Sequence, residues 1–177
     1  MQHTLVALVE DKPGVLNRVA SLFRRRAFNI ESLTVGHTEQ PGISRMTIVI
    51  DSNQTNVERV TANLYKLVNV IQIKDLADQP SVTRDLALIK VSAPAERRSE
   101  VMQLVEVYRA RIVDVTNDSL IVEITGDVDK IDSFVEVLRP MGVMEMVRTG
   151  LVAMARGAAL GQNGNGNGNS NGRYAAA

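Results

Sequence analysis

Apolar positions along this chain follow two spacings, and these spacings occur in the same order in its two halves. In the first half, the runs at 4–9 and 45–50 are dense in apolar and β-branched residues, as in buried strands. Val15, Val19 and Leu22 recur instead at helical spacing. The pattern predicts strands at 4–9, 29–35, 45–50 and 70–76, and helices at 14–26 and after a cap at Asn53 or Thr55.

The second half repeats the order strand, helix, strand, strand, helix, strand. Its predicted strands lie at 86–91, 112–115, 120–124 and 143–147, and its helices begin near Pro94 and after a cap at Asp127 or Asp129. Each half therefore predicts the βαββαβ order of a ferredoxin-like unit, and the chain an α+β fold with two such units in tandem. We assign the units to residues 1–78 and 84–158 and predict that the Gly/Asn-rich segment 161–177 is a flexible tail.

Both faces of the first predicted strand are apolar. Leu5 and Ala7 would point to one face of the sheet, and Val6 and Leu8 to the other. The two helices of a ferredoxin-like unit cover only one face of its antiparallel sheet. We therefore expect a cover over the second face. Open sheet edges also favour pairing with another copy, so we expect a homo-oligomer.

The amino-acid composition argues against several classes of function. The 177 residues include 20 Lys+Arg, 20 Asp+Glu and no Cys, and aromatics make up 3% of the chain. This balance argues against nucleic acid as the partner, because nucleic-acid-binding domains usually carry a basic excess and exposed aromatics. The first residues are not typical of a signal peptide, and no apolar run is long enough to span a membrane. We expect a cytoplasmic protein that binds neither nucleic acid nor membrane.

A turn between the first strand and the first helix is the clearest candidate for a binding site. In VEDKPGVLNRV, Pro13 and Gly14 form a sharp turn, and the N–H groups at the helix start can bind an anion such as a carboxylate. Asn29 and Ile30 could add polar contacts and an apolar wall. This combination suits a small zwitterion with an aliphatic side chain. Pro-Gly turns before helices are also common without any ligand.

The run VEDKPGVLNRVASLFRRRAFNIESLTVGHTEQPGISRMTIVI closely resembles the start of the small, regulatory subunit of acetolactate synthase, also called acetohydroxyacid synthase. The most diagnostic part is NIESLTV followed by SRMTIVI. The similarity continues through LYKLVNVIQIKDL, RDLALIKV, IVDVT and VRTGLVAMARG. It covers nearly all of the chain except the tail.

This resemblance implies an amino-terminal ACT domain that binds the feedback inhibitor and a carboxy-terminal domain of related topology that contributes to the contact with the catalytic subunit. In that family the small subunit is not the catalyst. Thiamine diphosphate, a divalent metal such as Mg²⁺ and FAD belong to the large subunit, which condenses pyruvate in branched-chain amino-acid biosynthesis. The small subunit raises this activity and makes it sensitive to valine.

The resemblance also assigns effector residues. Gly14, Val15 and Leu16 fall on the ligand loop at the helix start, and Asn29 and Ile30 on the facing wall across the interface of an ACT homodimer. Asp11 stands where the family often has Asn; its carboxylate could pair with the ligand ammonium or repel the ligand carboxylate.

Two other functions are compatible with the same residues. One is a stand-alone ACT-type amino-acid sensor that regulates a different enzyme or a transcription factor. The other is an enzyme on this small scaffold, although the chain offers only His3 and His37 as histidines and no GxSxG or HExxH pattern. The choice of effector among valine, leucine and isoleucine stays open.

Overall fold

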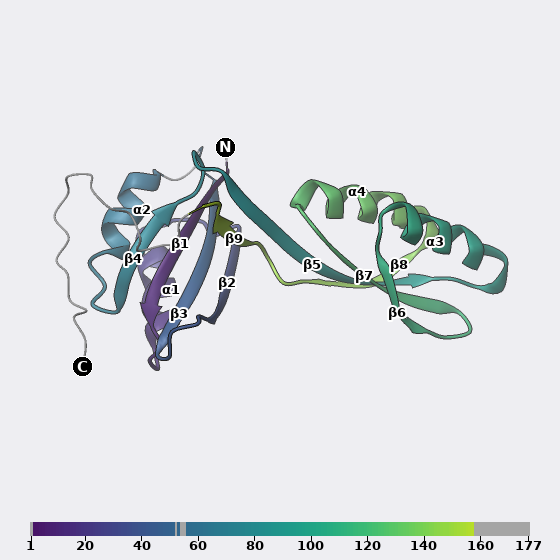
Figure 1. Ribbon diagram of the computed structural model, residues 1–177, viewed down its shortest axis with the longest axis horizontal. Coiled ribbons are helices and arrows are strands. Elements are labelled where there is room, and N and C mark those ends of the chain that lie inside the picture. The colour runs from purple at the N-terminus through teal and green to yellow at the C-terminus, as the bar shows by residue number, and fades with distance from the viewer. Residues whose placement is uncertain (1, 52, 54–55, 158–177) are drawn as a thin grey trace.

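The computed structural model describes residues 2–51, 53 and 56–157 and contains two α+β units joined by one long strand (Figure 1). In each unit a pair of helices packs on an antiparallel sheet. The predicted fold of two ferredoxin-like units is therefore confirmed. Segment 161–177 and Thr55 lie outside the described residues.

The first sheet has the strand order β2-β3-β1-β4. Its central strands β1 and β3 pair antiparallel, with Leu5 opposite Ile48, and both side chains are fully buried beneath the helices. Phe23 of α1 and Leu64 of α2 fill the same core. The elements are β1 (Gln2–Glu10), α1 (Val15–Arg25), β2 (Ser32–His37), β3 (Ile43–Asp51), α2 (Val57–Leu64) and β4 (Val70–Asp75).

The second sheet has the corresponding order β6-β7-β5-β8. Ile89 of β5 lies opposite Val122 of β7, and both pack with Phe134 of α4 in a separate core. The elements are β5 (Ser81–Ser92), α3 (Ala95–Val107), β6 (Arg111–Val115), β7 (Ser119–Gly126), α4 (Val128–Leu138), a 3-10 turn (Arg139–Met141), β8 (Val143–Arg148) and β9 (Val152–Ala155). None of the helices in these described ranges combines the length and apolar character needed to cross a membrane.

Strand β5 begins earlier than the sequence predicts. The sequence predicts a unit that begins at residue 84 and a strand at 86–91, but β5 starts at Ser81 because residues 81–84 pair antiparallel with β9. The sequence did not predict β9. This short strand follows the whole second unit along the chain and returns to the first unit (Figure 1).

The returning segment covers part of the second face of the first sheet. Ala153 of β9 packs with Val6, which is only 1% exposed, and with Leu76. The guanidinium of Arg45 on β3 donates a hydrogen bond to the Ala153 carbonyl at 2.6 Å. The chain itself thus supplies part of the cover expected from the apolar second face.

One predicted helix cap is wrong and another is confirmed. Asn56, not Asn53, caps α2: its side-chain oxygen accepts a hydrogen bond from the Arg59 N–H at 2.8 Å. The Asn53 N–H instead donates to the Asp51 carboxylate at 3.0 Å. Asp127 caps α4 as predicted, by accepting from the Lys130 N–H at 3.0 Å.

An ion pair with a buried carboxylate joins β5 to the end of β8. Asp85 is 4% exposed, and its carboxylate lies 2.6 Å from the guanidinium of Arg148, which also binds Asp132. Partial burial by itself lowers the pKa of Arg148, but the hydrogen bonds to Asp132 and Asp85 outweigh it and raise this pKa. Arg148 therefore stays charged and neutralises the buried carboxylate.

Removal of the Arg148 charge tests how much the pair with Asp85 contributes to the free energy of unfolding. Arg148→Met leaves the Asp85 carboxylate buried without its cation, so we expect the free energy of unfolding to fall by about 3 kcal/mol. The control is Arg139→Met, which removes an exposed pair with Glu136 and should cost less than about 1 kcal/mol. Urea denaturation of both variants measures the difference, and equal losses would contradict the argument from burial.

Candidate functional site

The turn after β1 has the geometry that the Pro-Gly pair indicated. Gly14 directly precedes α1 and has φ 84°, in the left-handed region that glycine adopts without strain. A Cβ at this position would meet nothing within 4 Å. The backbone conformation, rather than crowding, therefore favours glycine here.

The start of α1 offers unpaired N–H groups. The Val15 N–H bonds to the Lys12 carbonyl at 3.3 Å, and the Gly14 carbonyl accepts from the Arg18 N–H at 3.0 Å. Within the part of the chain that the structure describes, the N–H groups of Leu16 and Asn17 have no hydrogen-bond acceptor, and no side chain caps this helix. Such a helix start carries a partial positive charge and can bind a carboxylate.

Val15 and Leu16 occupy different environments. Val15 is 5% exposed and packs in the first core, so it anchors the turn. Leu16 is 47% exposed beside the free N–H groups. A ligand at the helix start would therefore have an apolar neighbour on the surface.

A polar network that the sequence did not predict fixes the Gly14 turn to the loop before β4. Buried Asn69 accepts from the guanidinium of Arg18 at 2.5 Å and donates to the Glu10 carboxylate at 2.6 Å. The Asn69 hydrogen bond, followed by the one from Lys12, lowers the pKa of Glu10. The network joins the end of β1, the first helical turn and the loop before β4. Its residues are far apart in the sequence, so no local pattern could have identified it.

Asp11 lies at the outer side of the turn and reaches toward strand β2. Its N–H donates to the Gly42 carbonyl at 2.8 Å, and its carboxylate lies 3.3 Å from Nδ1 of His37, the last residue of β2. Sequence reasoning assigned no role to His37. The contact shows that the Gly14 turn and the end of β2 lie at the same end of the sheet.

Asn29 and Ile30 lie at the opposite end of the sheet. They follow α1, whose 11 residues span about 16 Å away from Gly14. The Asn29 side chain is exposed and donates to the Glu31 carboxylate at 3.4 Å, while Ile30 packs partly against the first core. A single chain therefore does not bring these two residues to the Gly14 turn.

Outside the Gly14 turn, the first unit also holds a histidine beside a carboxylate. His3 lies 2.9 Å from the carboxylate of Asp75 at the start of β1. The described residues contain no group of three His, Cys, Asp or Glu side chains that could hold a metal ion.

Comparisons with known proteins agree with this arrangement in both units. A family model described as an "AHAS small subunit-like ACT domain" matches residues 5–72. A second model, described as "Small subunit of acetolactate synthase", matches residues 84–157. Together the two models cover most of the described chain.

Individual relatives match over nearly their full length. The chain is 54% identical over 157 residues to a "Probable acetolactate synthase small subunit" of Archaeoglobus fulgidus, covering 89% of this chain and 98% of the relative. It is 54% identical over 155 residues to the "Acetolactate synthase small subunit" of Mycobacterium leprae, covering 88% and 92%. The crystal structure of the acetolactate synthase small subunit from Thermotoga maritima superposes with a TM-score of 0.82 at 41% identity, covering 90% of this chain and 99% of that one.

Proposed function

The chain belongs to the family of acetolactate synthase small subunits, and from this premise we propose that it is a noncatalytic regulatory subunit. It associates with an acetolactate synthase catalytic subunit, raises its activity and makes that activity sensitive to valine. Thiamine diphosphate, Mg²⁺ and FAD are expected in the catalytic partner. The observation that carries the proposal is the start of α1 after Gly14, where the described structure gives the N–H groups of Leu16 and Asn17 no acceptor, in the unit that matches the ACT model.

The chemistry of valine fits this helix start. Burial of its isopropyl group is worth about 2 kcal/mol, whereas micromolar affinity needs about 8 kcal/mol in total. Both polar ends of the ligand must therefore be held. The free N–H groups at Leu16 and Asn17 suit the carboxylate, and the exposed Leu16 side chain lies beside them. The ammonium needs an acceptor from elsewhere.

A second copy of the chain supplies the missing wall in this proposal. Strand β2 is at the edge of its sheet. Asn29 and Ile30 lie just before its first residue, Ser32, and the Gly14 turn lies near its other end. Antiparallel pairing of two β2 strands about a two-fold axis brings the start of one beside the end of the other. Asn29 and Ile30 of one copy then face residues 11–16 of its partner, where the Asn29 side-chain oxygen accepts from the ammonium.

The Asp11 carboxylate contacts His37, and this contact is relevant to its role toward the ligand. His37 Nδ1, at the end of β2, lies 3.3 Å from the Asp11 carboxylate. In the proposed dimer this carboxylate serves the ligand ammonium, which a nearby opposite charge stabilises. Valine sensitivity in this proposal is thus compatible with Asp11.

The subunit assignment is tested by reconstitution. The purified chain should form no acetolactate from pyruvate with thiamine diphosphate and Mg²⁺, and should raise the rate of a separately purified catalytic subunit. Turnover by the chain alone would contradict the noncatalytic role. Normal valine binding without stimulation would favour a stand-alone amino-acid sensor instead.

Two substitutions at Gly14 test the ligand site. Asp and Asn both tolerate positive φ, and the structure has room for either Cβ. Gly14→Asp places a carboxylate about 4 Å from that of the ligand, so we expect valine binding to weaken at least tenfold. Gly14→Asn is the uncharged control and should bind more tightly than Gly14→Asp. Calorimetry measures both, and equal affinity of Gly14→Asp and the wild type would refute the site.

The interface site also links valine to dimerisation. A ligand held by two copies binds the dimer better than the monomer, so valine must strengthen the dimer. Sedimentation equilibrium of the full chain should show a lower dimer dissociation constant with saturating valine than without it. A chain that binds valine fully while it remains monomeric would contradict the shared site.

A further inference from the structure

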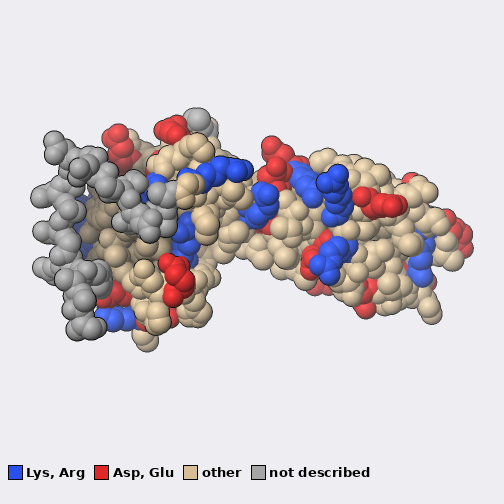
Figure 2. Space-filling model, viewed as in Figure 1, with Lys and Arg blue, Asp and Glu red and all other residues tan. Residues whose placement is uncertain are grey.

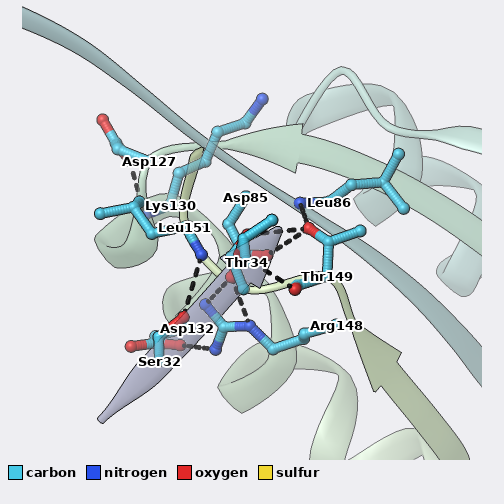
Figure 3. Close-up of polar contacts among 11 residues, drawn as sticks. Ser32, Thr34, Asp85, Leu86, Asp127, Lys130, Asp132, Arg148, Thr149 and Leu151 are labelled. Carbon is cyan, nitrogen blue, oxygen red and sulfur yellow. Dashed lines mark hydrogen bonds and ion pairs between the residues drawn. The ribbon is translucent and has the colours of Figure 1, made fainter. Parts of the chain in front are cut away.

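Three consecutive residues between β8 and β9 contact both units of the chain (Figure 3). The Thr149 N–H donates to the Leu86 carbonyl at 3.0 Å, and the Thr149 hydroxyl lies 3.1 Å from the buried Asp85 carboxylate. These bonds hold Thr149 to strand β5 of the second unit.

The same segment binds strand β2 of the first unit. The Thr149 carbonyl accepts from the Thr34 hydroxyl at 3.4 Å, and the Leu151 N–H donates to the Ser32 hydroxyl at 3.2 Å. We call this set the junction contact: Ser32 and Thr34 on one side, and Thr149, Gly150 and Leu151 on the other. It connects the buried Asp85 carboxylate of the second unit with the edge strand of the first.

Gly150 allows the close approach in the junction contact. Its φ is +86°, and a Cβ here would lie 2.6 Å from the Ser32 hydroxyl oxygen and 3.0 Å from that of Thr34. Any other residue at this position is both strained and too close to β2. The backbone of the segment therefore rests directly on the side chains of β2.

A cleft of about 490 Å³ lies beside the junction contact, lined by residues of both units that include Glu31, Ser32, Arg148 and Leu151. The space-filling view in Figure 2 shows a narrow waist between the two units. Hydrogen bonds from Ser32 and Thr34 join β2 to the segment Thr149–Leu151 beside this cleft, and the Leu151 side chain is buried there.

Strand β2 begins two residues after Ile30, which the proposed function places in the valine site. We propose that the junction contact couples occupancy of that site to the position of the second unit. A ligand that fixes Asn29 and Ile30 repositions Ser32 and Thr34, and the segment Thr149–Leu151 transmits the displacement to β5 and β8. This inference rests on the proposed function, because it takes valine as the effector.

Gly150→Ala tests the coupling, with Gly157→Ala as its matched control. Both glycines have positive φ, +86° and +85°, but a Cβ at Gly157 meets nothing within 4 Å. Each full-length variant is assayed with the catalytic subunit for stimulation, for inhibition by valine and, alone, for valine binding by calorimetry.

The two variants should differ in one property. We expect Gly150→Ala to bind valine within about threefold of the wild type and to stimulate within about twofold, while the maximal inhibition at saturating valine falls to less than about half of the wild-type value. Gly157→Ala should match the wild type in all three measurements. Normal inhibition of the Gly150→Ala complex would overturn the proposal. Loss of valine binding would place the segment in the ligand site and would overturn it as well.

Hydrogen exchange of the wild-type chain gives a second, independent test. Saturating valine should change the exchange rates of the Thr149 and Leu151 amides. The Arg156 amide, which donates to the Pro80 carbonyl at 2.8 Å outside the junction contact, should stay unchanged. Valine that binds without altering the first two amides refutes the coupling. A wild-type chain that does not bind valine refutes the proposed function itself, which separates the two failures.

Discussion

The need to cover the second face of the first sheet determines how the two units are joined. Helices protect only one face of this sheet, yet Val6 on the other face is apolar and buried. Exposure of such a side chain costs about 1.5–3 kcal/mol, and the chain avoids this by returning from the second unit as β9. Because β9 pairs with the start of β5, this short strand both covers part of the second face of the first sheet and connects the two units.

Much of this fold could be predicted from apolar spacing, since each unit is built from strands and helices that have one buried face. Strand β9 could not, because it has four residues and its partner strand is some 70 residues earlier in the sequence. Asn56 was missed as the cap of α2 because Asn53 and Thr55 are of equally suitable residue types. The first residue of α2 depends on where β3 ends, and the end of β3 is set by its pairing with β1.

The candidate site was only partly predictable for a topological reason. Pro13 and Gly14 indicated a turn and a helix start, and the structure has both. The strand order makes β1 and β2 parallel, so the start of β2 lies at the opposite end of the sheet from the Gly14 turn. Local patterns in the sequence suggested that Asn29 lies beside this turn, whereas the family resemblance placed it across a dimer interface. Only the second interpretation is compatible with this topology.

The energies at the junction contact suit a regulatory role better than a purely structural one. Each neutral hydrogen bond there, such as Leu151 N–H to Ser32, contributes about 1 kcal/mol net. Coupling between two binding sites is typically about 1–3 kcal/mol, so a ligand can rearrange this contact without unfolding the chain. On the other side, the charged pair between Arg148 and the buried Asp85 carboxylate is more costly to break. In the proposed coupling, the segment Thr149–Leu151 is held firmly on the side of β5, and its contact with β2 can rearrange. A displacement of β2 can then move the second unit.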